Sequence, residues 1–124
     1  HQKLQVDNRV ISFENVDIRD FTVQRRFELV TSAVSFISLH DILESVDALS
    51  KKWIVLLFKP QFEVGKEAKR DSNGVVLDAK AIESAKTAFE EQTDALGWKL
   101  VHHEPSTLSG KEGNIEECYC FEKC

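Results

Sequence analysis

The sequence predicts an α/β protein organised around a largely parallel sheet. Apolar, β-branched segments alternate along the chain with segments in which apolar residues recur at helical spacing. The segment Ile54–Phe58 is apolar at every position, which is typical of a strand buried on both faces. We therefore expect the order strand, strand, helix, strand, helix, strand, strand.

The composition favours one globular domain without a membrane segment. The chain has 124 residues, a net charge of -5 and 42% hydrophobic residues, and it lacks any apolar run near the roughly 20 residues that span a bilayer. The start of the chain lacks the apolar core of a signal peptide. We expect a cytoplasmic protein with no membrane partner.

The first half of the chain contains two predicted strands before the central one. Val10–Phe13 and Phe27–Thr31 are short apolar segments. Ser38 begins a predicted helix and has the spacing of a capping box with Asp41. The helix shows apolar residues at helical spacing: Leu39, Ile42, Leu43, Val46 and Leu49.

The central strand, Trp53–Phe58, ends abruptly at Lys59-Pro60. Proline removes a backbone donor and favours extended geometry in the residue before it, so the strand should stop here. Lys59 then lies at the carboxyl edge of the sheet, where ligands bind in open α/β folds. The alternative is a solvated charge that only marks the end of the strand. Residues 59–78 form a long predicted loop.

The second half predicts a helix between two strands, followed by a final strand. Asp78 can cap a helix from Ala79 to about Leu96, and Gly97 is suited to end it. Trp98–His103 and Asn114–Phe121 are the closing strands, joined by a turn-rich connection from Thr107 to Gly113.

Cysteines and basic residues supply two further candidate sites. Cys118, Cys120 and Cys124 are an odd set near the C-terminus, and Cys118 and Cys120 would share a strand face. They lack the partner ligands of a metal site, so we expect reduced thiols and no metal. Because the chain is acidic, any affinity for RNA must come from a local patch, either Arg25-Arg26 or Lys66, Lys69 and Arg70. The alternative for both patches is a solvated face.

Three segments resemble the TlyA-type family of FtsJ-related ribose methyltransferases, which are often called hemolysins. They are Val34-Ser-Phe-Ile-Ser-Leu39, then Lys59-Pro-Gln-Phe-Glu-Val-Gly65 with Gly74-Val-Val-Leu-Asp78, and Gly110-Lys-Glu-Gly-Asn-Ile-Glu116. The resemblance covers nearly the whole chain. It implies S-adenosylmethionine as methyl donor and ribosomal RNA or a ribosomal subunit as substrate.

The resemblance also implies a truncated Rossmann-like methyltransferase sheet. Residues 1–124 would be the C-terminal portion of a single methyltransferase domain, with strands three to seven and an antiparallel last strand inserted beside the fifth. The first two strands and the glycine-rich turn after the first are missing from the sequence. Val10–Phe13 would be the third strand without its usual partner, so we expect it to be displaced, to pair with the next strand, or to pair with a second copy of the chain.

The resemblance assigns roles to a small set of residues. Lys59 matches the lysine that acts on the ribose hydroxyl, and Glu116 matches the acid that holds this lysine. Ala33 stands where the family has a catalytic aspartate. A natural loss of activity, an engineered change and compensation by another group all stay open as explanations for Ala33.

The cofactor positions follow from the same resemblance. Asp17 matches the acid that receives the adenine of S-adenosylmethionine, and Ile18 would pack against the adenine ring beside Ala33. The alternative for Asp17 is an ordinary turn residue. Two functions therefore stay open: a fragment of an rRNA ribose methyltransferase that is inactive as this isolated chain, or a non-catalytic RNA- or ribosome-binding module that has lost activity through Ala33.

Overall fold

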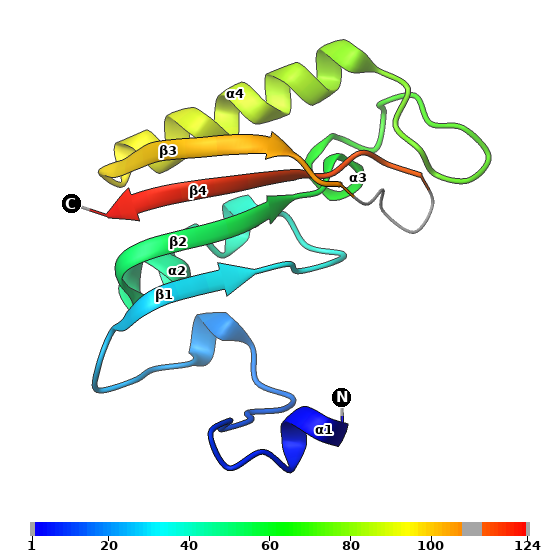
Figure 1. Ribbon diagram of the computed structural model, residues 1–124. Helices are drawn as coiled ribbons and strands as arrows, with labels where there is room; N and C mark the ends of the chain where they lie inside the picture. Colours follow the sequence, from blue (N-terminus) through cyan, green and yellow to red (C-terminus); the bar gives the residue numbers. More distant parts are fainter. Residues whose placement is uncertain (1, 108–112, 124) are drawn as a thin grey trace.

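The described part of the protein is organised around one mixed sheet. The computed structural model describes residues 2–107 and 113–123, and within them a four-stranded sheet has the order β1-β2-β4-β3 (Figure 1). Its strands are β1 (Phe27–Ser32), β2 (Ser50–Phe58), β3 (Trp98–Pro105) and β4 (Glu117–Lys123). β1 and β2 are parallel, whereas β4 is antiparallel to both β2 and β3. The α/β class and the inserted antiparallel last strand are confirmed.

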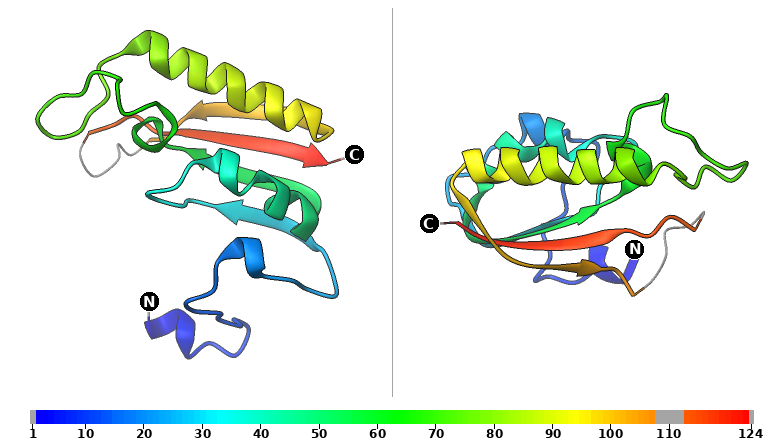
Figure 2. Two further views of the ribbon diagram at one scale, coloured as in Figure 1. Left: turned by 180° about the vertical axis from the view of Figure 1, so that it is seen from behind. Right: turned by 90° about the horizontal axis from the view of Figure 1, so that it is seen from above.

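Two helices cover one face of this sheet. Figure 2 shows α2 (Leu43–Leu49) and α4 (Ala79–Ala95) on the same side of the strands. Shorter helical segments are α1 (Gln2–Gln5), η1 (Ile18–Asp20), η2 (Leu39–Asp41) and α3 (Pro60–Glu63). The segment predicted as one helix from Leu39 is therefore a 3-10 turn followed by α2.

The core lies between the helices and the covered face of the sheet. Side chains of β2 point alternately to the two faces of the sheet, as in any strand. Ile54, Leu56 and Phe58 point into this core, while Val55 and Leu57 face the other side. The apolar face predicted for the helical segment from Leu39 to Leu49 is buried, so this prediction is confirmed. The fully buried core side chains are Leu39, Ile42, Leu43, Val46, Ile54, Leu56, Phe58, Tyr119 and Phe121.

Local signals set both ends of α4. The Asp78 carboxylate accepts a hydrogen bond from the Ala81 amide at 3.0 Å, as an N-cap does. Gly97 follows the helix at a φ of +84°, a left-handed conformation that glycine adopts without a Cβ penalty. Both predicted boundaries are confirmed.

The predicted strand Val10–Phe13 is wrong. These residues form no strand in the described chain, and β1 pairs with β2 alone. Ile11 is 79% exposed. The physical reason is that a short extended segment needs a neighbouring backbone to bond its amides, and here none is provided. The segment is displaced from the sheet, and its pairing with a second copy stays a prediction.

The last strand begins later than predicted, at Glu117 rather than Asn114. The Asn114 side chain accepts from the Val76 amide at 3.0 Å and donates to the Gly74 carbonyl at 3.3 Å. It therefore ties the loop before α4 to the approach to β4. The predicted loop of residues 59–78 also contains α3. Most of the predicted connection before β4 lies outside the described residues.

A buried carboxylate joins α4 to the two closing strands. Glu117 on β4 is 7% exposed. It forms an ion pair with Lys86 of α4 and lies 2.6 Å from the Nδ1 atom of His103 on β3. Burial raises the pKa of Glu117, but the hydrogen bonds from Lys86 and His103 outweigh this and leave the pKa below its ordinary value.

We predict that Glu117→Gln lowers the free energy of unfolding near neutral pH by about 2 kcal/mol, because a charge-assisted pair is lost. A carboxyl group whose pKa is lowered in the folded state stabilises the fold at pH values above its ordinary pKa. This stabilisation is lost as the pH falls through the lowered pKa. The difference between variant and parent should therefore shrink in acid below pH 4.5, the ordinary value. Urea unfolding at several pH values measures it.

The matched control is Glu28→Gln, which removes the exposed ion pair to Lys51, where both side chains are 66% exposed. Its effect should stay below about 1 kcal/mol. Equal losses in both variants would contradict the role given to Glu117.

Candidate active site

The candidate site lies where the parallel strands β1 and β2 end. Ala33 directly follows β1, and Lys59 directly follows β2. Because the two strands are parallel neighbours, their carboxyl ends meet at the same edge. The Lys59 ammonium donates to the Ala33 carbonyl at 3.2 Å and to the Ser35 hydroxyl at 3.0 Å. Lys59 is thus held by the segment that follows β1.

A pocket at this edge brings Lys59 and Glu116 together. The pocket has a volume of about 580 Å³ and lies between the ends of β1 and β2 and the start of β4. Its lining residues are Ser35, Phe36, Lys59, Gln61, Phe62, Arg70, Asn73, Gly74, Asn114 and Glu116. The two residues that the sequence singled out for chemistry therefore share one cavity.

Glu116 is linked to the pocket through Gln61. Its buried carboxylate accepts a hydrogen bond from the Gln61 amide at 2.9 Å. The hydrogen bonds of Lys59 in the described structure go to the segment after β1, so Gln61 takes the place beside Glu116 that was expected for Lys59. The Oε1 atom of Gln61 is buried and has no hydrogen-bond partner among the described residues, which leaves an acceptor on the pocket wall.

A second carboxylate, Glu63 of α3, joins the segment that follows β2 to the segment that follows β1. It accepts from the Ser38 hydroxyl at 2.6 Å and from the Leu39 amide at 2.8 Å. Burial raises the pKa of Glu63, although these two hydrogen bonds oppose the rise. Because Ser38 ends the segment that holds Lys59, Glu63 fixes the spacing between the ends of β1 and β2.

Phe36 is the least expected side chain of the site. It is 90% exposed and adopts a φ of +65°, a conformation that is rare for a bulky residue and that marks a constrained position. Its ring lies 5.0 Å from that of Phe62. An exposed aromatic ring beside a polar pocket is suited to stacking on a planar base. Phe36 lies within Val34–Leu39, one of the segments that resemble the family. The sequence does not single it out, and its suitability for stacking follows only from the exposure of its ring in the structure.

The residues predicted to hold the adenine lie outside the lining of this pocket. Asp17 caps η1 and forms a bidentate pair with Arg19, which lowers the pKa of Asp17 to about 2. Ile18 packs on the core and borders an apolar pocket of about 410 Å³ along β1. The pocket beside Ile18 is lined mainly by apolar side chains, whereas the carboxylate of Asp17 is paired with the Arg19 guanidinium. The predicted roles of Asp17, Ile18 and Ala33 stay predictions.

The remaining sequence predictions concern metal, membrane and the downstream motif. Among residues 2–107 and 113–123, no three His, Cys, Asp or Glu side chains are grouped as metal ligands. Cys118 and Cys120 are free thiols, and burial raises the pKa of Cys118. No helix in this part of the chain is long and apolar enough to cross a bilayer. Gly110, Lys111, Glu112 and Cys124 lie outside the described residues.

Comparison with known proteins identifies relatives along the whole chain. The model of the family described as FtsJ-like methyltransferase matches residues 1–123. The 23S rRNA (cytidine-2'-O)-methyltransferase TlyA of Campylobacter jejuni is 48% identical over 123 residues, which are 99% of this chain and 49% of that protein. The 16S/23S rRNA (cytidine-2'-O)-methyltransferase TlyA of Mycobacterium tuberculosis is 36% identical over 118 residues, covering 91% of this chain and 44% of that protein.

Solved structures share the fold. A protein from Streptococcus thermophilus, described as a hemolysin, superposes with a TM-score of 0.88 at 29% identity, covering 99% of this chain and 46% of that one. A second, from Lactococcus lactis, gives a TM-score of 0.83 at 30% identity, covering 100% of this chain and 62% of that one. The chain spans about half the length of the curated relatives it matches.

We predict that Glu63→Ala speeds hydrogen exchange at the Leu39 amide, because this amide loses its acceptor. The same variant should lower the free energy of unfolding by about 1–3 kcal/mol, since a buried donor is left without a partner. Glu63→Gln keeps one carbonyl oxygen and should change both quantities less. Unchanged exchange at Leu39 in Glu63→Ala would show that the two loops are held by other contacts.

Proposed function

This chain belongs to the FtsJ-like methyltransferase family, and on that premise we propose that it carries the catalytic pocket of an S-adenosylmethionine-dependent rRNA ribose 2'-O-methyltransferase. The observation that supports this most is the shared pocket of Lys59 and Glu116 at the ends of the strands. The relatives named TlyA, which methylate cytidine 2'-oxygens of rRNA according to their names, support ribosomal RNA as the substrate.

In the proposed fold, the sheet corresponds to strands four to seven of a Rossmann-like methyltransferase. The parallel pair β1 and β2 would be the fourth and fifth strands. β4, antiparallel and between β2 and β3, would be the inserted seventh. This assignment places Lys59 after the fifth strand, at the edge where ligands of such sheets bind.

Each pocket residue has a proposed task. Lys59 binds the ribose 2'-hydroxyl, either orienting it or receiving its proton. Ser35 and the Ala33 carbonyl hold the ammonium in place. Glu116, bound by Gln61, supplies a negative charge to the pocket that partly offsets its cations.

The methyl donor would be held by residues on the other side of β1. Ile18 would pack against the adenine, with Asp17 near its amino group and Ala33 beside it. Bound S-adenosylmethionine would supply an electrophilic methyl group to the 2'-oxygen. For Asp17 to accept from an adenine amino group, its carboxylate must share or release Arg19.

A second function, RNA binding without turnover, is favoured by Ala33. Its methyl side chain offers no acceptor, and Lys59 bonds to its backbone carbonyl instead. A missing member of a preorganised polar set typically costs orders of magnitude in rate. Under this alternative, the chain binds ribosomal RNA and transfers no methyl group.

The proposal is tested by labelled-methyl transfer to purified ribosomal subunits with the gene product that contains this chain. We expect Ala33→Asp to transfer methyl about 100-fold faster than the parent, because the carboxylate restores a charge partner beside Lys59. Ala48→Asp, which adds the same charge at an exposed position of α2, is the matched control and should not change the rate. Binding of subunits without transfer by either protein would favour the second function.

The role of Lys59 is tested in whichever protein transfers methyl faster, the parent or Ala33→Asp. Lys59→Ala should lower kcat by about 100- to 10,000-fold with little change in KM, since the lysine acts on the reacting hydroxyl. Lys99→Ala, at an exposed lysine of β3, is the control. A rise in KM with unchanged kcat would assign Lys59 to substrate binding alone.

A further inference from the structure

Arg70 is a fixed cation on the pocket wall and forms no ion pair with a carboxylate of residues 2–107 or 113–123. Its guanidinium donates to the carbonyls of Gly65, Ala68 and Gln61, at 3.3, 3.2 and 3.2 Å. These neutral acceptors hold the side chain in one place and leave its charge intact. The guanidinium has five N–H donors in all, so the bonds found in the described structure leave donors for a ligand.

The ion pairs among the described residues leave Arg70 and its neighbours out. Arg9 and Arg19 each form a bidentate pair with a neighbouring aspartate. None of the ion pairs among the described residues includes Lys59, Lys66, Lys69 or Arg70, and none includes Arg25, Arg26, Lys52 or Lys99. What distinguishes Arg70 from these other cations is that its guanidinium is held by carbonyls on the wall of the pocket that contains Lys59.

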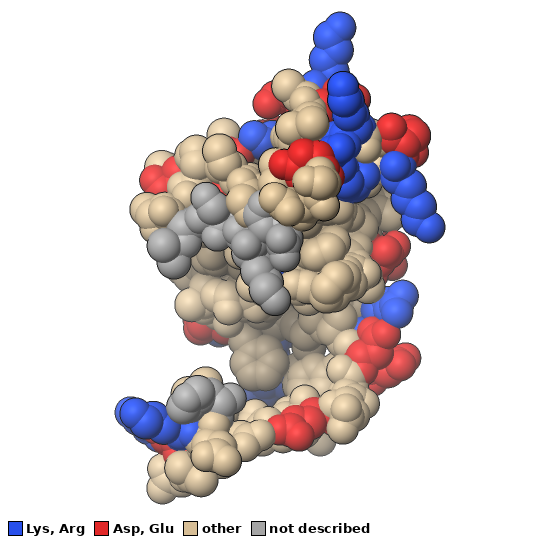
Figure 3. Space-filling model, turned by 90° about the vertical axis from the view of Figure 1, so that its right-hand side faces the viewer, with Lys and Arg blue, Asp and Glu red and all other residues tan. Residues whose placement is uncertain are grey.

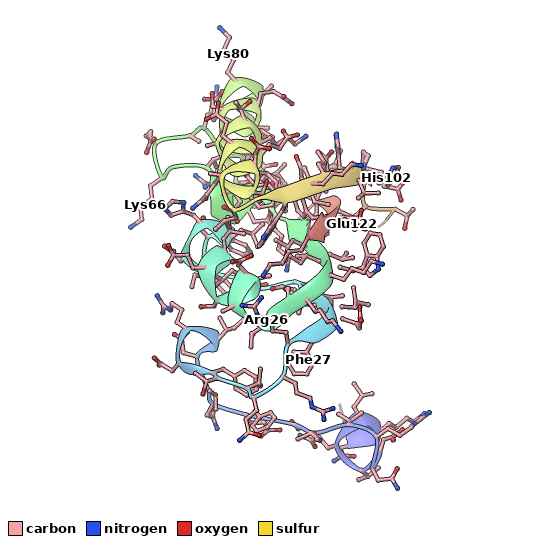
Figure 4. All side chains as sticks on the ribbon, turned by 90° about the vertical axis from the view of Figure 1, so that its left-hand side faces the viewer. Arg26, Phe27, Lys66, Lys80, His102 and Glu122 are labelled. Atoms are coloured by element: carbon pink, nitrogen blue, oxygen red, sulfur yellow. The ribbon has the colours of Figure 1, made fainter. Side chains whose placement is uncertain are left out.

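Asp71, an acid of this loop, is turned toward the loop backbone. The Asp71 carboxylate accepts from the amides of Asn73 and Val75, at 2.8 and 2.9 Å. Lys66 and Lys69 of the loop are exposed. Figure 4 shows Lys66, and Lys80 at the start of α4, directed away from the molecule. In Figure 3, blue side chains gather in the upper part of the face that carries the strand ends.

We propose that Arg70 forms a phosphate subsite of the pocket, which binds a phosphodiester of the RNA strand whose ribose lies at Lys59. Lys66 and Lys69 form the outer part of this subsite. Planar guanidinium groups bind phosphate oxygens through paired hydrogen bonds. The chain has a net charge of -5, so it repels RNA over most of its surface and this local charge determines where the strand binds. This inference rests on the proposed function for the identity of its ligand.

The test is the salt dependence of RNA binding by the gene product that contains this chain, with a fluorescein-labelled oligocytidine RNA as probe. Arg70→Gln should weaken binding and reduce the slope of log K against log salt by about 0.7, the value for one phosphate contact to a single strand. Arg70→Lys keeps the charge and should keep most of the slope. Lys66→Gln with Lys69→Gln should reduce the slope further while leaving the carbonyl contacts of Arg70 intact.

Arg26→Gln is the matched comparison because it makes the same charge change in the other basic patch that the sequence offers, Arg25-Arg26, at the opposite end of the parallel strands. Arg26 directly precedes β1 (Figure 4), whereas Lys59 binds Ala33, the residue that follows β1. A strand of this length separates the two ends by roughly 20 Å. Arg26→Gln should leave the slope unchanged. The proposal is overturned if Arg70→Gln and Arg26→Gln have equal slopes, or if the double lysine variant binds like the parent.

The outcomes separate this inference from the proposed function. Oligocytidine binding needs no methyl donor, so a reduced slope in Arg70→Gln supports the subsite even when the parent transfers no methyl. Methyl transfer by the parent with an unchanged slope in Arg70→Gln overturns the subsite and leaves the proposed function standing. Circular dichroism of each variant shows whether it is folded. If Arg70→Gln is unfolded, the slope of the double variant Lys66→Gln, Lys69→Gln decides whether the subsite exists.

Discussion

The candidate site depends on the central strand β2 being paired along both edges and ending at one residue. β1 and β4 bond to its two sides, so its backbone cannot shift without breaking two ladders. Pro60 then ends the strand, because it has no amide to donate. Lys59 is therefore fixed in depth relative to the ends of the neighbouring strands. A charged side chain on a flexible loop would lose this precision.

Fixing one strand end does not by itself build a pocket, because the loops that leave the sheet must also be held. Glu63 does this between α3 and the segment after β1, and Asn114 does it between the loop before α4 and the approach to β4. Both side chains bond to backbone groups of a distant segment. The pocket is thus closed by polar contacts between loops, while the apolar core beneath it supplies the stability.

The sequence predicts the layers well because burial leaves a periodic pattern. The helical spacing of apolar residues from Leu39 to Leu49 predicts a buried face, and the capping Asp78 marks the start of α4. The all-apolar segment Ile54–Phe58 predicts a strand buried on both faces, whereas Val55 and Leu57 on one face are only half-buried. Val10–Phe13 also has an apolar pattern, yet a strand exists only with a partner, and pattern alone does not report the partner. Lys59 and Glu116 could be selected by resemblance. Gln61 could not, because its contact with Glu116 joins residues far apart in sequence and follows from packing.

Under the proposed function, position 33 acts on binding and on chemistry in opposite directions. Among its described lining residues, the pocket has the cations Lys59 and Arg70 and one carboxylate, Glu116. An aspartate at position 33 would add a second negative charge beside Lys59, whereas alanine leaves an excess of positive charge among these residues. That excess would favour an anionic RNA strand at the pocket. The proposed chemistry needs instead a polar group that orders Lys59 toward the hydroxyl, and a backbone carbonyl provides only a neutral acceptor. Alanine at this position would therefore strengthen the pocket as a binding site while it weakens it as a catalyst.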